Sequence, residues 1–428
     1  METKKKGFPV AFWVCACSEI FERLAYYLGR SLILIFVTAS VATGGLGLSD
    51  TVAANMQSNL TAFSYLLPLF GAVIVDKYIG ARYTTPVGMF IAAAGYFTGG
   101  IAKSAIGVYV MIFLVSLGLA LFKNGAIIGR VITDKSQMDP AFSMRYTLVN
   151  VGAFIGTFLV GILYKDVFAK DGVLGFAPCF KMAALMMVLG GLWYIFVCWR
   201  FLGDLGKLPF KKTLTEEEKA AEAKKKEETG TKQPLTTIEK KRIGAIFVAS
   251  LFSIVFWIFW YLGYMPVYFY WAENMDWVVA GYQVPSTWFD AANSLFCVIL
   301  GPVTAALWKK LAARPQGDMS LFRKTGLGIA IIGVGYLFYA AIDIMRGGEK
   351  ASVLWLIVFA FLLTMGEMFF SPLGHSFISK YSPSRYLAVM MSVWGFATFI
   401  AAKSYGPVYG LLFGGKIEFK VACIGVAV

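Results

Sequence analysis

Long apolar stretches separated by short polar loops recur along the whole chain. A transmembrane helix needs about 20 predominantly apolar residues. Eleven stretches of about that length lie at residues 11–37, 51–75, 83–102, 106–130, 142–163, 178–201, 243–271, 287–308, 324–344, 353–378 and 386–406. A twelfth apolar run begins after Lys420 and stops at Val428, so we expect the last helix to be incomplete. The pattern predicts an all-α, multi-pass membrane protein.

One polar segment divides these stretches into two groups. Between residues 203 and 242 the composition changes to Lys, Glu, Ala and Thr with few large apolar side chains, which is typical of a solvated linker. We therefore predict an N-terminal six-helix bundle at 1–202, a charged cytoplasmic linker at 203–242, and a C-terminal bundle at 243–428 whose twelfth helix is incomplete. Two similar six-helix halves are a common construction among membrane carriers.

Composition and charge agree with a membrane location. Hydrophobic residues make up 58% of the 428 residues and charged residues only 15%, with a mean hydropathy of +0.68. Most of the 39 Lys and Arg residues fall in loops on the side of the N-terminus. Cytoplasmic loops are enriched in these residues, so the N-terminus is expected in the cytoplasm. The expected location is the inner membrane of the cell. The net charge of +14 follows from that topology and does not indicate nucleic-acid binding.

Charged and aromatic residues form a stripe inside the first apolar stretch. Successive members are separated by steps that bring them to one face of a helix. They are Glu19, Glu22, Arg23, Tyr26, Tyr27 and Arg30. Each charge would cost several kcal/mol in lipid, so the stripe is expected to face a water-filled or paired interior, where such groups mark substrate or proton pathways. The alternative is a purely structural network of ion pairs.

Two more charged residues lie within later apolar stretches. Lys123 is in the fourth stretch and Glu367 is in the tenth. Together with the first stripe they make three acids and three bases, and protonating one carboxylate would free a basic partner for a substrate carboxylate. The pattern therefore indicates a proton-coupling switch. The alternative is that Lys123 anchors Glu19 or Glu22 as a permanent strut.

Several motifs resemble those of the proton-dependent oligopeptide transporter (POT) family of the major facilitator superfamily. The first-stretch run Glu19-x-x-Glu22-Arg23 followed by Tyr26-Tyr27 is similar to the signature of the family's first helix. The further matches are Lys123-Asn124, Glu367-x-x-x-Ser371-Pro372-Leu-Gly374, Met390-Met-Ser-Val-Trp394 and a loop from Gly71 to Arg82 similar to the superfamily signature. The resemblance covers nearly the whole chain and implies the superfamily fold of two six-helix bundles.

The resemblance also implies a function, a proton-coupled symporter that imports di- and tripeptides by alternating access. The residues matching the family's proton-coupling group are Glu19, Glu22, Arg23 and Lys123. Arg30 and Lys123 would face the peptide carboxylate and Glu367 the peptide amine. The pocket would be lined by Tyr26, Tyr27, Tyr65, Asn150, Asn293 and Trp394. The implied partners are peptides, protons and the lipid bilayer, and the protein is expected to be monomeric with no cofactor besides the coupling proton.

One departure from the family pattern favours a second hypothesis about the substrate. The family usually carries an acid in its seventh helix after a Phe-Trp pair, but no acid follows Phe256-Trp257 within that stretch up to Leu262. How Arg30 is paired is therefore open, and the alternative is a carrier of the same fold for another small anion or zwitterion with altered proton coupling. An enzyme or sensor is disfavoured, because the chain has one histidine and no recognisable nucleophile–base arrangement.

Overall fold

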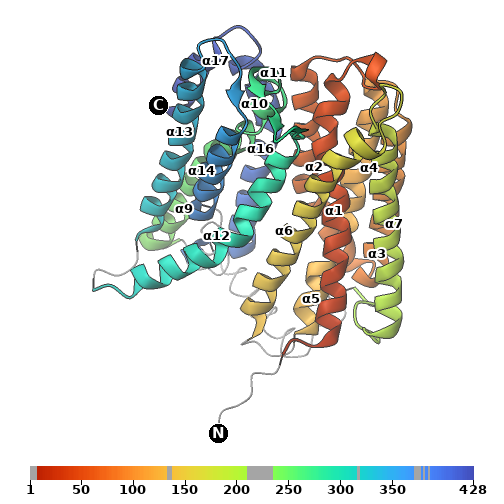
Figure 1. The fold of residues 1–428 in the computed structure, drawn as a ribbon. Coiled ribbons are helices and arrows are strands. Elements are labelled where there is room, and N and C mark those ends of the chain that lie inside the picture. Colours follow the sequence, from red (N-terminus) through yellow and green to blue (C-terminus); the bar gives the residue numbers. More distant parts are fainter. Residues whose placement is uncertain are drawn as a thin grey trace. The chain divides into compact units, whose positions relative to one another are not determined.

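The computed structural model describes residues 7–132, 137–209, 235–315, 319–370, 377–378, 381–383 and 386–428, and helices dominate it. Its helices divide between two compact units (Figure 1). Unit 1 contains Met1–Gly47 and Leu67–Thr213, and unit 2 contains Leu48–Leu66 and Leu214–Val428. The long helix α2, Asp50–Lys77, contributes residues to both units.

Unit 1 is built from transmembrane-length helices and their short extensions. Besides the second part of α2, its elements are α1 (Val10–Thr38), η1 (Val41–Thr43), α3 (Ala81–Ile101), α4 (Ala105–Leu121), α5 (Asn124–Val131), α6 (Met138–Ile162), η3 (Leu163–Val167) and α7 (Phe176–Arg200). The helix α1 packs against α5, α6 and α7, while α3 packs between α4 and α7 (Figure 1). Unit 1 therefore surrounds the charged helix α1 with helices of its own.

Unit 2 combines helices with four very short strands. Besides the first part of α2, its elements are α9 (Thr237–Leu262), α10 (Met265–Tyr268), α11 (Tyr270–Asn274), β1 (Met275–Asp276), β2 (Val278–Val279), β3 (Tyr282–Gln283), α12 (Trp288–Ala312), α13 (Leu321–Met345), β4 (Ala351–Ser352), α14 (Leu354–Phe370), α16 (Leu387–Leu412) and α17 (Phe419–Ala427). The strand β1 pairs in parallel with β4, and β2 pairs antiparallel with β3. Packing of α14 against α12 and α13 brings together the polar residues of this unit.

The helices follow the apolar stretches closely, with two corrections. The fourth stretch, expected as one helix over 106–130, is broken between α4 and α5 at Lys123. There the backbone N–H of Lys123 donates to the Thr85 hydroxyl at 3.3 Å, which replaces a helical hydrogen bond. The seventh begins at Thr237, earlier than the apolar run at 243, because Thr236 and Glu239 form a capping box.

The membrane-spanning character is evident in the described helices. Six of them are long and apolar enough to cross a bilayer, and two shorter apolar helices cover Ala105–Leu121 and Leu354–Phe370. The helix α1 is 29 residues long and would also reach across, although it carries the charged stripe. The protein is therefore a multi-pass membrane protein.

Two glycines set the register of α6 against α1. A Cβ atom added to Gly156 would lie 2.4 Å from the carbonyl oxygen of Leu24, and one added to Gly152 would lie 2.9 Å from that of Ile20. Such close backbone approach is possible only with glycine, as in other small-residue crossings of membrane helices. This crossing lies beside the Glu19–Arg23 segment of α1 and so places α6 next to the charged stripe.

Candidate functional site

Two buried carboxylates of α1 form the centre of the charged site in unit 1. Glu19 and Glu22 are both completely inaccessible to solvent. The Nε atom of Arg23 lies 2.7 Å from Glu22 Oε2 as an ion pair, yet neither oxygen of Glu22 accepts a well-aligned hydrogen bond within the described part of the chain. Glu22 is thus a buried acid stabilised mainly by one neighbouring charge.

Glu19 is held differently, by donors from two other helices. Arg145 Nε of α6 donates to Glu19 Oε1 at 2.8 Å. Asn124 Nδ2 of α5 donates to the same oxygen at 3.2 Å and to the carbonyl oxygen of Cys15 at 2.8 Å. The structure therefore assigns Arg145 as a cation of Glu19, a residue absent from the sequence-based set.

A sequence signal for Arg145 existed. Arg145, Gly152 and Gly156 are separated by seven and four residues, so they lie on one face of a helix. The two glycines are the positions where α6 meets α1, and a basic residue on the same face is directed toward the same neighbour. Arg145 was not predicted as a site residue, because a basic residue at the end of an apolar stretch is common.

Lys123 lies at the break between α4 and α5. Its ammonium group donates to the carbonyl oxygen of Pro68 at 2.8 Å, within unit 1. Pro68 lies inside α2, so this hydrogen bond ties the broken fourth helix to the second. A role for Lys123 in proton coupling stays a prediction.

The remaining stripe residues continue along α1. The guanidinium carbon of Arg23 lies 5.4 Å from the ring centre of Tyr26, and the rings of Tyr26 and Tyr27 meet edge to face at 5.3 Å. Arg30 is buried, and Tyr27 is partly exposed. On α6, the side-chain amide of Asn150 donates to a carbonyl oxygen one turn earlier in its own helix, at 3.0 Å. The charges and aromatic rings of α1 thus follow one another along the helix as the periodicity predicts.

Unit 2 contains a buried carboxylate of its own. Glu367 on α14 is 8% exposed, and Asn293 Nδ2 of α12 donates to its Oε2 atom at 3.1 Å. Asn293 Nδ2 also donates to the Thr364 hydroxyl at 2.8 Å, and the Cys297 thiol lies 3.7 Å from Glu367 Oε2. The structure therefore brings together Asn293 and Glu367, which the sequence placed in one pocket. Residues 371–376, with Ser371, Pro372 and Gly374 of the tenth-helix motif, lie outside the described residues.

Aromatic rings lie next to this carboxylate. Phe370, three residues after Glu367, stacks on Phe256 with ring centres 3.9 Å apart and on Trp394 at 6.4 Å. The hydroxyl of Tyr261 donates to that of Tyr65 at 3.2 Å, and Tyr65 is 44% exposed. Two of the aromatic residues predicted to line a pocket thus lie in unit 2. Trp394 stacks on Phe370, and Tyr65 lies on α2.

A second buried acid of unit 2 was missed by the sequence reasoning. Asp290 in the first turn of α12 is 6% exposed and accepts a hydrogen bond from the Tyr268 hydroxyl at 2.5 Å. It lies near the start of the apolar stretch 287–308, and none of the recognised motifs includes it. The set of three acids and three bases is thus incomplete, because Asp290 and Arg145 belong to the buried or half-buried charges as well.

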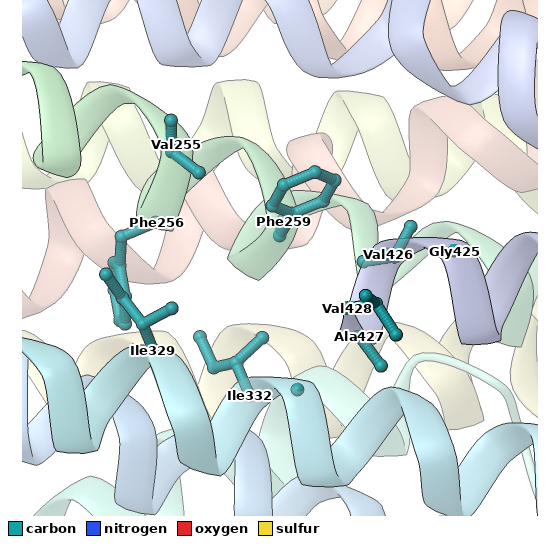
Figure 2. Close-up of a pocket in the computed structure, with 10 residues that line it drawn as sticks. Val255, Phe256, Phe259, Ile329, Ile332, Gly425, Val426, Ala427 and Val428 are labelled. Atoms are coloured by element: carbon teal, nitrogen blue, oxygen red, sulfur yellow. The ribbon is translucent and has the colours of Figure 1, made fainter.

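A separate cavity of about 260 Å³ lies between α9, α13 and α17. Figure 2 shows that Phe259 of α9, Ile332 of α13 and Val428 at the chain end border it. Its lining consists of aliphatic and aromatic side chains and glycines, with no charged side chain. The cavity therefore lacks groups for the charged ends of a small zwitterion, and it is distinct from the buried carboxylates.

Membrane-spanning helices that bury paired acids and bases away from lipid define the class of this protein as a multi-pass membrane transporter. The POT family model (PTR2) matches residues 204–413. Over this part the chain is similar to the POT family, which is a family of transporters and not of enzymes.

Individual relatives are distant but similar over most of their length. The chain is 25% identical over 439 residues to an uncharacterized transporter of Bacillus subtilis, covering 93% of this chain and 87% of the relative. It is 24% identical over 441 residues to a di-/tripeptide transporter of Lactococcus lactis, covering 91% and 86%. A crystal structure of a POT family transporter in complex with 5-aminolevulinic acid superimposes with a TM-score of 0.84 at 23% identity, over 99% of this chain and 95% of that one. The major facilitator fold expected from the sequence is thereby confirmed.

Proposed function

We propose that this protein is a proton-coupled symporter that imports di- and tripeptides across the cell's inner membrane by alternating access, with its N-terminus in the cytoplasm. The observation that carries the proposal is the pair of fully buried carboxylates, Glu19 and Glu22, next to guanidinium groups inside a membrane-length helix. The match of residues 204–413 to the POT family model and the similarity to a di-/tripeptide transporter support the substrate class. Protons are the coupling ion, no further cofactor is needed, and the monomer is the working unit.

The two carboxylates are suited to different steps of proton coupling. Glu22 has one ion pair, to Arg23, and no aligned hydrogen-bond donor within the described residues, so protonating it disrupts few interactions. Glu19 Oε1 accepts two hydrogen bonds, one of them charge-assisted, so protonating Glu19 disrupts more interactions. We therefore assign Glu22 as the first acceptor of the transported proton. Arg23 and Lys123 are the basic residues that respond to its neutralisation.

The peptide is recognised by charges at its two ends. Arg30 and Lys123 bind the carboxylate, and Glu367, oriented by Asn293, binds the amine. Walls for the side chains are supplied by Tyr26, Tyr27, Tyr65, Asn150 and Trp394. Aromatic walls tolerate varied side chains, which suits a carrier of many different peptides.

Uptake by purified protein in proteoliposomes tests this function. An inward proton gradient is expected to drive accumulation of a labelled dipeptide by the wild type, and Glu22→Gln is expected to abolish accumulation while leaving exchange of internal for external peptide. Glu418→Gln, at an exposed acid of unit 2, is the control and should behave like the wild type. Equal accumulation with and without the gradient would rule out proton-coupled import.

A second candidate is a carrier of another small zwitterion or anion. It is favoured by the stretch from Phe256 to Leu262 in α9, which has no acidic residue. The related structure holding 5-aminolevulinic acid shows that one transporter of this fold binds a small zwitterion that is not a peptide. Competition of dipeptides, amino acids and 5-aminolevulinic acid against labelled substrate separates the candidates, because a peptide carrier will be inhibited most strongly by the dipeptides.

A further inference from the structure

The guanidinium group of Arg145 lies where three helices of unit 1 converge. Arg145 comes from α6, its acceptor Glu19 from α1, and the second donor to the same oxygen, Asn124, from α5. Glu19 is completely buried, whereas the Arg145 side chain is 30% exposed. The pair therefore joins an inaccessible carboxylate to a base that reaches a more open region.

The fold leaves room for this guanidinium at one glycine. A Cβ atom added to Gly125 of α5 would lie 2.9 Å from the Cζ atom of Arg145 and 3.0 to 3.1 Å from its two terminal nitrogens. Any larger residue at this position would push the guanidinium away from Glu19. On the other side, the Gly152 and Gly156 crossing brings the α6 backbone against α1. Gly125 thus leaves the space that the guanidinium occupies, and Gly152 and Gly156 allow the close approach of α6 to α1.

Other titratable groups near Glu19 come mainly from α1. They are Glu22, Arg23 and Cys15 of α1, and Tyr194 of α7. Among them Arg23 is the cation paired with Glu22, so Arg145 and Arg23 each hold a different carboxylate. A change at Arg145 therefore acts first on Glu19.

We propose that Arg145 is a positioning residue of proton coupling, whose ion pair holds the Glu19 carboxylate in place until a proton arrives. When Glu19 takes up that proton its carboxylate becomes a neutral acid, while the guanidinium keeps its own proton and is released from the ion pair. Because the pair links α1 to α6 beside the break in the fourth helix, its release loosens the contact between these two helices. This inference rests on the proposed function and adds to it the base that is paired with Glu19.

The test is the dependence of dipeptide uptake on external pH in proteoliposomes, for four variants beside the wild type. Arg145→Gln removes the cation paired with Glu19, so uptake of the proton no longer has to break an ion pair, and half-maximal uptake is expected to shift by about one pH unit toward alkaline pH. Arg145→Lys should restore most of the wild-type profile. A merely structural role would lower the amount of folded protein without moving this midpoint.

Two glycine variants give a matched comparison in which every charge is retained. Gly125→Ala displaces the guanidinium and should shift the midpoint in the same direction as Arg145→Gln. Gly129→Ala, one turn further along α5, places its methyl group at an ordinary 3.6 Å from the Phe142 ring and should leave the profile unchanged.

The outcomes separate the inference from the function on which it rests. Wild-type uptake that does not respond to pH would overturn the proposed function and the role of Arg145 with it. Wild-type uptake that responds to pH, with superimposable profiles for Arg145→Gln, Gly125→Ala and wild type, would overturn the role of Arg145 alone. If Arg145→Gln yields no folded protein, the comparison of Gly125→Ala with Gly129→Ala decides.

Discussion

At the scale of single residues, unit 1 and unit 2 hold their buried carboxylates by different means. Glu19 and Glu22 lie beside guanidinium groups at 2.8 and 2.7 Å. Glu367 instead accepts a hydrogen bond from the neutral amide of Asn293 at 3.1 Å. Protonating a carboxylate next to a fixed positive charge releases that charge, whereas a carboxylate next to a neutral donor is available to bind a cationic group such as a peptide amine.

Replacement of Asn293 tests this difference. Asn293→Ala removes the donor that orients Glu367, and we expect the apparent affinity for dipeptide to fall by about tenfold, the effect of losing a hydrogen bond to a charged group. Competition binding with a dipeptide measures the effect. Thr364→Val, which removes an acceptor of Asn293 but no donor to Glu367, should weaken binding much less. Equal losses in the two variants would show that Asn293 acts through packing alone.

At the scale of helices, close glycine contacts explain how charged residues from distant parts of the chain meet. The backbone of α6 approaches that of α1 at Gly152 and Gly156. Likewise α3 approaches α4 at Gly118, where an added Cβ atom would lie 2.4 Å from the Gly88 carbonyl oxygen. Membrane helices gain little from the hydrophobic effect between one another, so small residues at crossings contribute much of their association. The positions of Glu19 and Arg145 depend on the first of these crossings.

Substitution of Gly156 should therefore destabilise unit 1. In Gly156→Ala the added Cβ atom would lie 2.4 Å from a backbone oxygen of α1, which cannot rotate away, and we expect a loss of about 1–3 kcal/mol. Thermal unfolding of the detergent-solubilised protein measures it. Gly395→Ala in α16, where an added Cβ atom meets nothing within 4 Å, is the control and should unfold at or slightly above the wild-type temperature. A wild-type melting temperature for Gly156→Ala would contradict the close crossing.

A polar cluster ties α11 to the end of α13 in unit 2. Asp343 accepts hydrogen bonds from the Tyr270 hydroxyl and from Arg346 Nε, the latter at 2.7 Å, and Arg346 also donates to the Tyr270 oxygen at 2.8 Å. The Tyr270 ring stacks on Phe419 of α17 at 3.8 Å. The Asp343 carboxylate thereby connects α11 to α13, and the Tyr270 ring extends the contact to α17.

Asp343→Ala should destabilise this end of unit 2. It leaves two partly buried side chains, Arg346 and Tyr270, without their shared acceptor. We therefore expect the free energy of unfolding to fall by about 1–3 kcal/mol. Asp204→Ala removes an acid whose side chain is 90% exposed and which pairs with Lys207, and should change stability little. Thermal unfolding of both variants in one buffer distinguishes them, and equal melting temperatures would mean that the cluster adds no stability.

At the scale of the whole molecule, the order and extent of the helices could be predicted from the sequence because a bilayer requires apolar stretches of fixed length. The face of α1 followed from local periodicity, and resemblance located Asn293 and Glu367, which the structure places in contact. The glycines Gly152 and Gly156 could have indicated the face of α6 that carries Arg145, but they do not identify its partner Glu19, which lies 126 positions away in the chain. The break at Lys123 was missed because the apolar run resumes after Lys123, Asn124 and Gly125, so that the stretch as a whole has the length of one helix.

The most direct test of the central proposal, that peptide and proton move together through the α1 carboxylates, is a measurement of proton movement itself. Proteoliposomes with a pH-sensitive dye inside and no initial pH difference receive dipeptide on the outside. Wild-type vesicles held at an inside-negative potential are expected to acidify as peptide enters, and vesicles with Glu22→Gln are expected not to. Peptide entry into wild-type vesicles without any acidification would contradict the proposal.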